Sequence, residues 1–175
     1  MCRPPLSALN LLPEKPCAEA GRTSSLSVAE AVKADIILVA VGAVAFKDLG
    51  AVLQDWSGRI VIDVTNGFML PPQVQQAEYR ERLTSEVNAE RVPGAKLVKA
   101  FNQLPIKVLA SALPDDVGRR VVFVSSDHED ASATVAALAE SLGFAAIEVG
   151  RIAEGGRLIQ ARAPLVFQNL IKYPL

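Results

Sequence analysis

The sequence predicts an α/β fold, a Rossmann-like open parallel sheet with helices on both faces. Four apolar runs alternate with helix-like stretches, and each run ends in a small or polar residue; they span residues 34–42, 59–67, 96–103 and 119–127. Such alternation is typical of parallel sheets whose strand ends open onto a ligand crevice. Half of the 175 residues are hydrophobic and only 5% are aromatic, which suits β-branched strands packed beneath Ala/Leu-rich helices.

A single domain is expected over residues 26–175, after an irregular segment. Residues 1–25 hold four of the eleven prolines and show no periodicity. Order is expected to begin with a capping box between Ser27 and Glu30, at the start of a short helix. Strands are further expected at 35–41, 60–64, 97–100, 121–125 and 146–149. Helices are expected at 44–54, from 83 or 85 to 91, at 105–111, at 129–142 with Asp127 as candidate cap, and at 158–171, where the helix is amphipathic. A long polar loop leads from the second of these strands to residue 82.

Composition argues against several classes of function. The chain has 18 basic and 19 acidic residues and no basic stripe, so no nucleic-acid partner is expected. No apolar run reaches the ~20 residues that span a bilayer, so no membrane partner is expected. Cys2 and Cys17 match no metal or redox spacing, which favours a reduced, cytoplasmic compartment.

The carboxyl ends of the strands are the expected ligand site, because ligands bind there in open parallel sheets. Gly42 and Ala43 would let a ligand approach the main chain closely. Asn66 and Asn102 offer amides that suit a carboxamide or a sugar hydroxyl. Either asparagine alone is also common in turns, but two at equivalent places on neighbouring strands favour a binding crevice. The strand-end residues are Val41, Gly42, Ala43, Thr65, Asn66, Phe101, Asn102, Ser125 and Ser126.

Two charged residues interrupt apolar strands. Asp63 requires a partner, either on the following loop or in Lys99 if both side chains point to one face. His128, the only histidine, falls at a helix start and is expected on the surface. No catalytic residue and no metal site are predicted, because no Ser-His-Asp or Cys-His set can be assembled. Hydride transfer needs neither, since nicotinamide and acceptor rings carry that chemistry themselves.

Five stretches together resemble the NADP oxidoreductases that use the deazaflavin coenzyme F420, and their bacterial dinucleotide-binding relatives. They are SLSVAEAVKADIILVAV, GRIVIDVTNG, PGAKLVKAFNQLP, RRVVFVSSDHEDASATVAALAESLGF and EGGRLIQARAPLVFQNLIK. The resemblance implies NADP across the strand ends, with Val41 and Gly42 near its ribose and pyrophosphate. It also implies that Thr65 and Asn66 lie towards the nicotinamide, and that the hydride-transfer site is lined by Ala100, Phe101 and Asn102.

The chain departs from the family pattern mainly at its front. Family members begin with a strand, a G-x-G-x-x-G turn, a helix and a second strand, and these 175 residues contain no such motif. An N-terminal truncation relative to the family is therefore expected, with weaker phosphate binding and an open edge at the first strand. Gly42 and Gly67 stand where many members carry proline, and Gln103 where threonine is usual.

The sequence thus predicts an NADP-dependent oxidoreductase that transfers hydride to a deazaflavin F420, a flavin or a similar acceptor, weakened or inactive if the phosphate loop is lacking. The alternative is a non-catalytic nucleotide-binding or oligomerising scaffold domain that pairs through the open edge. The choice between NADP and NAD stays open. A homodimer through the C-terminal helix is expected.

Overall fold

Five strands form one sheet in the order β1-β2-β3-β4-β5, and a sixth strand pairs with β4. The computed structural model describes residues 26–67, 73, 79, 82–114 and 117–173, so the irregular segment expected at 1–25 and most of the expected polar loop lie outside the described residues. The strands are β1 (Ile36–Val39), β2 (Ile60–Asp63), β3 (Lys96–Ala100), β4 (Arg119–Ser126), β5 (Ala145–Glu148) and β6 (Ile171–Lys172).

The sheet is mostly parallel, as predicted, with one reversal. β1, β2 and β3 run parallel, β4 runs antiparallel to β3, and β5 runs parallel to β4. A parallel return after β3 would need a crossover helix packed on the sheet. The helix in that connection, α6 (Ile106–Leu109), buries none of its residues, so it does not serve as one.

The reversal corrects one part of the predicted site. β4 runs antiparallel to β3 and its last residue, Ser126, lies opposite Val98 in the middle of β3, so the carboxyl end of β4 points towards the other edge of the sheet. There the Ser126 hydroxyl donates to Leu97 O at 2.7 Å, and the Ser125 hydroxyl donates to Gly150 O at 2.9 Å. Both serines therefore satisfy the backbone away from the other predicted strand ends.

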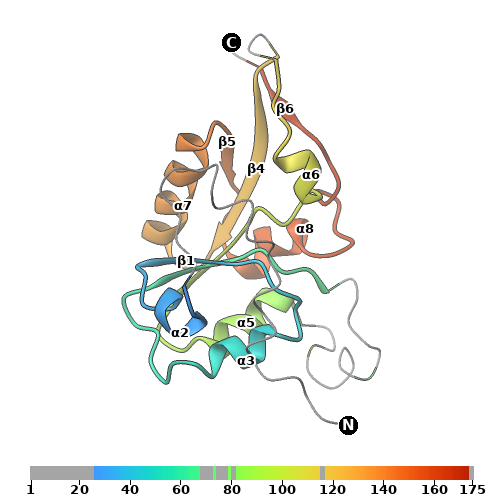
Figure 1. Cartoon of the computed structure of the whole chain (residues 1–175). Coiled ribbons are helices and arrows are strands. Elements are labelled where there is room, and N and C mark those ends of the chain that lie inside the picture. The colour runs from blue at the N-terminus through green and yellow to red at the C-terminus, as the bar shows by residue number, and fades with distance from the viewer. Residues whose placement is uncertain (1–25, 68–72, 74–78, 80–81, 115–116, 174–175) are drawn as a thin grey trace.

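Helices cover both faces of the sheet, which confirms the Rossmann-like expectation. On one face lie α2 (Val28–Ala31), α3 (Phe46–Gly50) and α5 (Thr84–Arg91); on the other lies α7 (Glu129–Ser141). Figure 1 also shows β1 running across the view while β4 runs nearly vertically, which is the twist expected of such a sheet. The first core contains Val32, Ile37, Val39, Phe46, Trp56, Val61, Leu83, Val92, Leu97 and Ile152. The second contains Ile62, Val98, Ala100, Phe101, Val122, Val124, Ala131, Val135 and Ala139.

The predicted N-terminal cap is present at α2 but differs at α7. At α2 the Glu30 carboxylate accepts from the backbone N–H of Ser27 at 2.9 Å, as the capping box requires. At α7 the cap position is His128, which is exposed, rather than Asp127. Asp127 instead accepts from the N–H of Ile152 at 3.3 Å, so its side chain fixes the loop after β5.

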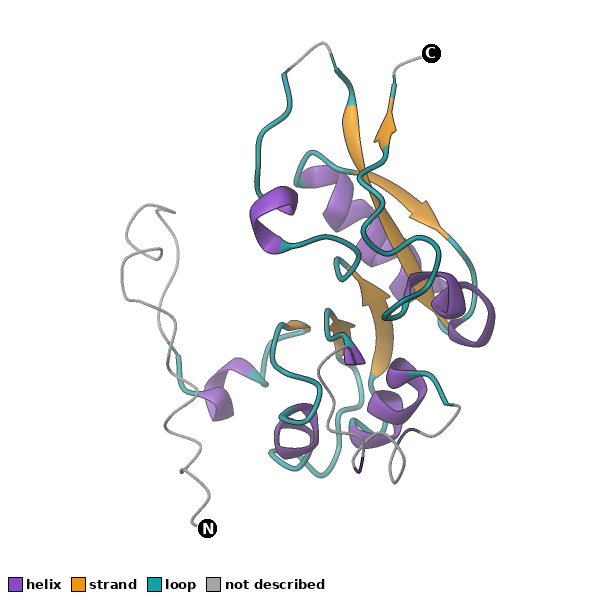
Figure 2. Ribbon diagram, turned by 90° about the vertical axis from the view of Figure 1, so that its right-hand side faces the viewer, coloured by secondary structure: helices purple, strands orange, loops and turns teal. Residues whose placement is uncertain are grey.

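The prediction of an amphipathic helix at 158–171 is wrong. The chain forms a π-helical turn, η4 (Ile152–Gly156), and a three-residue helix, α8 (Arg157–Ile159), before it leaves helical conformation at Gln160. Arg162 and Phe167 have φ of 68° and 65°, and Pro164 between them cannot donate a helical hydrogen bond. β6 follows beside the first half of β4 (Figure 2). The helix through which dimerisation was expected is therefore absent.

Candidate functional site

The carboxyl ends of β1, β2 and β3 meet at one edge of the sheet. Val39 lies opposite Asp63, and Asp63 lies opposite Lys99, so the three strands end in step. Their following residues, 41–43, 65–66 and 101–102, are thus placed side by side. This is the position at which ligands bind in open α/β sheets.

Gly42 is a glycine that the fold itself does not require. Its φ lies outside the left-handed region, and a Cβ built on it would meet no atom within 4 Å. Gly42 is exposed, whereas Ala43 beside it is buried and Val41 packs partly on the first core. Space without a side chain at a strand end is what close approach of a ligand to the main chain needs.

Asn66 and Asn102 bind one another through their amides, as their equivalent positions suggested. Asn66 Nδ2 donates to Asn102 O at 2.8 Å, and Asn102 Nδ2 donates to Asn66 Oδ1 at 3.0 Å. Asn102 Nδ2 also donates to Ile159 O at 2.5 Å. Because carbonyl oxygens only accept, these contacts fix the orientation of both amides. The pair joins β2, β3 and the C-terminal segment.

One acceptor of this amide pair has no hydrogen-bond partner among the residues that the structure describes. Asn102 Oδ1 is buried and receives no hydrogen bond from the described residues, although only 5% of Asn102 is exposed. An unsatisfied buried acceptor costs about 1–3 kcal/mol. Asn102 Oδ1 is therefore an acceptor that the described residues leave unused.

Phe101 holds an unusual backbone conformation at the same place. Its φ is 58°, in the left-handed region that a bulky side chain rarely adopts, which costs about 1–3 kcal/mol. Its ring packs edge-on against Phe144 at 5.9 Å between centroids. Next to it, Gln103 O accepts from the N–H of Phe167 at 2.7 Å, and Phe167 is also left-handed. Strain is thus concentrated where β3 meets the C-terminal segment.

Asp63 and Lys99 form the buried ion pair that the sequence raised as one alternative. Their side chains are 0% and 1% exposed, and Lys99 Nζ lies 3.4 Å from Asp63 Oδ2. The other alternative is also present, because Asp63 Oδ1 accepts from the N–H of Thr65 at 2.8 Å. Burial lowers the pKa of the Lys99 ammonium, although the Asp63 carboxylate beside it acts in the opposite direction.

The predicted site residues differ in how they could meet a ligand. Gly42 and Asn66 are accessible, whereas Thr65 is 2% exposed and Ala100 is 0% exposed. Ala100 belongs to the second core, so it supports the strand end from beneath. The structure joins Asn66 directly to Asn102, and it links Thr65 and Ala43 through other side chains.

Four side chains of this polar network were not predicted as site residues from the sequence: Tyr79, Ser85, Asn88 and Arg91. Asn88 is fully buried, and its amide bonds Asp63, Thr65 and the Arg91 guanidinium. Ser85, Asn88 and Arg91 are three residues apart, so they share one side of α5. That polar spacing was a readable signal; the position of Tyr79 was not.

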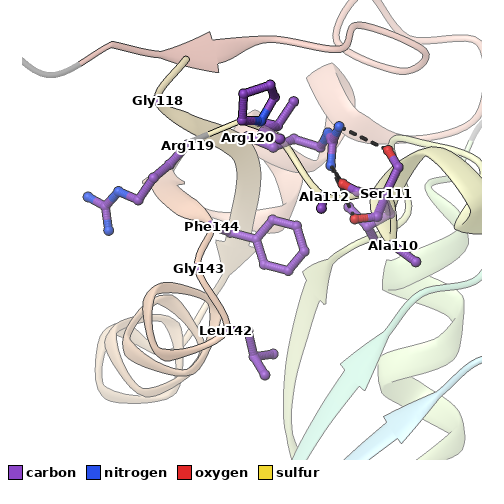
Figure 3. A pocket seen from close by; sticks show the side chains of 12 residues that line it. Ala110, Ser111, Ala112, Gly118, Arg119, Arg120, Leu142, Gly143 and Phe144 are labelled. Atoms are coloured by element: carbon purple, nitrogen blue, oxygen red, sulfur yellow. Dashed lines mark hydrogen bonds between the residues drawn. The ribbon is translucent and has the colours of Figure 1, made fainter. Parts of the chain in front are cut away.

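A cavity of about 580 Å³ lies beside Phe144, at the first residues of β4. It borders Arg120, which is 5% exposed and donates to Asn169 Oδ1 at 2.9 Å. Figure 3 shows the bonds from Arg120 to Ser111, of which the one to Ser111 O is 2.7 Å long. This arginine ties β4 to the segments before and after it. The cavity includes none of the predicted strand-end residues, so Arg120 is assigned a structural role.

A second hollow, of about 760 Å³, lies at the carboxyl end of β4 and is rich in acidic residues. Across the described part of the chain, no three His, Cys, Asp or Glu residues are grouped as metal ligands would be. None of the helices in that part is both long and apolar enough to cross a bilayer.

Comparison with known proteins identifies relatives of this chain. The model of the family described as NADP oxidoreductase, coenzyme F420-dependent, matches residues 13–67. The solved structure of a hypothetical protein from Sinorhizobium meliloti is 41% identical, with a TM-score of 0.76 over 83% of this chain and 70% of that one. A structure from Arthrobacter sp. FB24, named as a proposed F420-dependent NADP reductase, is 25% identical, with a TM-score of 0.56 over 73% of this chain and 60% of that one.

A mammalian relative is similar over a smaller part of its own length. The metalloreductase STEAP3 of Rattus norvegicus is 30% identical over 119 residues, which are 68% of this chain but 23% of the rat protein. The match of the family model includes the first two strand ends, at residues 41–43 and 65–66. This chain belongs to the family of coenzyme F420-dependent NADP oxidoreductases.

Proposed function

We propose that this chain binds NADP(H) across the carboxyl ends of β1, β2 and β3 and takes part in hydride transfer to a flat redox acceptor, a deazaflavin F420 or a flavin. The observation that carries the proposal is the buried, unpaired Oδ1 of Asn102 beside the Asn66 amide. The carboxamide of a nicotinamide has two N–H donors, and this acceptor suits one of them. The family description, which names NADP and F420, supports the same choice.

Each predicted site residue then has a specific task. Gly42, between Val41 and Ala43, leaves room for the ribose and pyrophosphate. The amides of Asn66 and Asn102 orient the carboxamide, while Thr65, Ala100 and Phe101 shape the floor and exclude water. The bound nicotinamide supplies the hydride chemistry, and the protein supplies orientation.

A cofactor analogue tests the task of Asn102 directly. The analogue with an acetyl group in place of the carboxamide lacks both N–H donors, so Asn102 Oδ1 stays unpaired. We expect it to bind about tenfold more weakly than NADPH, by titration of energy transfer from Trp56, the only tryptophan. Asn102→Leu removes the acceptor oxygen, so the preference for NADPH over the analogue should disappear in that variant. Equal affinity for NADPH and the analogue would contradict the proposal.

Gly42→Ala tests the approach of the cofactor to the first strand end. The added methyl group meets open space in the protein, so stability should be kept. NADPH affinity should fall at least severalfold, because the methyl group would occupy the ligand's space. Unchanged affinity would remove Gly42 from the site. The same titration of the unmodified chain measures the weakened binding expected from the sequence.

The rival function, an oligomerising scaffold domain, is favoured by one observation at β1. Ile36 and Leu38 are 38% and 53% exposed, and β1 pairs only with β2 among the described strands. Light scattering distinguishes the two functions: a stable oligomer without NADPH binding favours the scaffold, and a monomer that binds NADPH excludes it. The expected homodimer and cytoplasmic location stay predictions, and light scattering and cell fractionation test them.

A further inference from the structure

Thr65 is fixed at three polar atoms by side chains that never reach the surface. Its N–H donates to Asp63 Oδ1 at 2.8 Å, its carbonyl oxygen accepts from Lys99 Nζ, and its hydroxyl accepts from Asn88 Nδ2 at 3.2 Å. The three holding residues are at most 1% exposed. Thr65 immediately precedes Asn66, so this grip sets where the Asn66 amide lies.

The carboxylate at the centre of this grip is saturated. Asp63 Oδ2 accepts from Ser85 Oγ at 3.0 Å and from Asn88 Nδ2 at 3.3 Å, and it faces Lys99 Nζ at 3.4 Å. Burying two charges costs more than burying apolar side chains of similar size, so such a pair is weak evidence for stability alone. What an apolar pair could not supply is the directed contacts to the backbone of Thr65.

The same network continues to the end of β1. Arg91 donates to Asn88 Oδ1 at 3.2 Å and to Tyr79 Oη at 2.9 Å. Arg91 and the Tyr79 hydroxyl both lie within reach of Ala43 O, at 3.5 and 3.4 Å. One polar network in α5 thereby connects the backbone after β1 with the backbone after β2.

We propose that Asp63, Lys99 and Asn88 are positioning residues, which hold the strand ends after β1 and β2 in the geometry that receives the cofactor. They touch no ligand themselves. The inference rests on the proposed function, because it explains how Asn66 is aimed, but it names residues that the proposed function does not use. If apolar residues replace Asp63 and Lys99, the chain should still fold, but the backbone of Thr65 and the amide of Asn66 should no longer be held in place.

The test compares two double variants, each of which removes one ion pair made by a lysine of β3. Asp63→Leu with Lys99→Met removes the buried pair, and Lys96→Met with Asp130→Leu removes the exposed pair at the other end of the same strand. Asn88→Leu serves as a second variant if the first does not fold. Three measurements are made on each chain: cooperative unfolding, NADPH affinity by titration, and hydrogen exchange of the amides around Thr65.

We expect the buried-pair variant to unfold cooperatively, to bind NADPH at least tenfold more weakly, and to exchange the Thr65 amide at least tenfold faster. The control variant should match the wild type in affinity and exchange. Equal affinity and exchange in the wild type and the buried-pair variant would overturn the positioning role. A wild type that does not bind NADPH would instead overturn the proposed function, and the Thr65 exchange rates would still decide whether these residues hold the strand ends.

Discussion

The ends of β2 and β3 are held by polar side chains of their own, whereas β1 has none, and the segment after it is contacted only at Ala43 O by the side chains of Tyr79 and Arg91 among the described contacts. At β2 and β3, Asp63, Lys99, Asn66 and Asn102 bond one another or the neighbouring backbone. β1 offers no polar side chain within its four residues, and alternate residues are exposed. Residues 63–66 and 99–102 thus form a hydrogen-bonded half of this sheet edge, here called the rigid half, and residues 41–43 form the open half.

This difference indicates which part of the candidate site is preorganised for ligand binding. A network that is complete before a ligand arrives holds its groups in place, so little ordering is needed on binding. The β1 end contributes space at Gly42 rather than directed groups. We therefore expect substitutions in the rigid half to affect stability and affinity together, and those in the open half to affect them separately.

Breaking the buried ion pair on one side should have the largest effect on stability. Lys99→Met leaves the Asp63 carboxylate buried without its cation, which should lower the free energy of unfolding by about 3–5 kcal/mol. Asp63→Leu should cost a similar amount. The double variant should recover most of that loss, because neither charge is then left alone. Urea unfolding followed by Trp56 fluorescence measures all three, and additive losses would contradict a coupled pair.

The two faces of β1 should respond differently to the same change. Ile37→Ala, at a position 8% exposed in the first core, should cost about 2–5 kcal/mol. Ile36→Ala, at the neighbouring position with 38% exposure, should cost far less. Comparison of the urea midpoints checks the pair. Equal costs would mean that something covers the outer face of β1 in solution.

The amide pair should contribute less than the ion pair. Asn66→Ala removes the donor to Asn102 O and the acceptor for Asn102 Nδ2. A loss of about 1–3 kcal/mol is expected, because buried groups are left unpaired. The same urea titration measures it. No loss would mean that water replaces the Asn66 amide without cost.

The stability of the chain should rise with pH in the alkaline range. Burial lowers the pKa of Lys99 below its ordinary 10.5, so between the two values the unfolded chain binds more protons than the folded one. The free energy of unfolding then increases with pH, by at most about 1.4 kcal/mol per pH unit for one proton. Urea unfolding of the wild type and of Lys99→Met should diverge accordingly. Parallel curves would place the Lys99 pKa at its ordinary value.

The smallest effect on stability is expected at the open half. Gly42→Ala should leave the free energy of unfolding unchanged or raise it by about 0.4–1 kcal/mol, since alanine narrows the unfolded ensemble and meets no atom in the folded chain. Gly58→Ala is the control, because Gly58 has a φ of 78° and an equally open surrounding. It should destabilise the chain. Thermal unfolding compares the two.

Much of the fold could be predicted because each strand carries its own signal. The apolar runs located β1 to β5, and the capping box located α2. The direction of β4 could not be predicted, because it depends on whether α6 packs on the sheet, and its sequence does not say so. The prediction of the last helix was wrong because it relied on the helical spacing of apolar residues. Pro164 and the left-handed conformations of Arg162 and Phe167 are incompatible with a continuous helix there.

The candidate site could be predicted only where its residues directly follow the strands. Asn66 and Asn102 were found because both follow a strand, and Asp63 and Lys99 because charges stand out among apolar neighbours. Asn88 and Ile159 come from distant parts of the chain, so their contacts depend on tertiary packing. The left-handed backbone of Phe101 has no signature in its residue type.

The bond from Asn102 to Ile159 spans 57 positions of the chain. During synthesis, the amide pair therefore cannot be completed until the C-terminal segment has left the ribosome. Contacts between distant positions also form slowly, because a long loop must close before they stabilise anything. A nascent chain that has made all of β1, β2 and β3 would still present an unfinished crevice, so these strand ends are expected to become competent for the cofactor only late in folding.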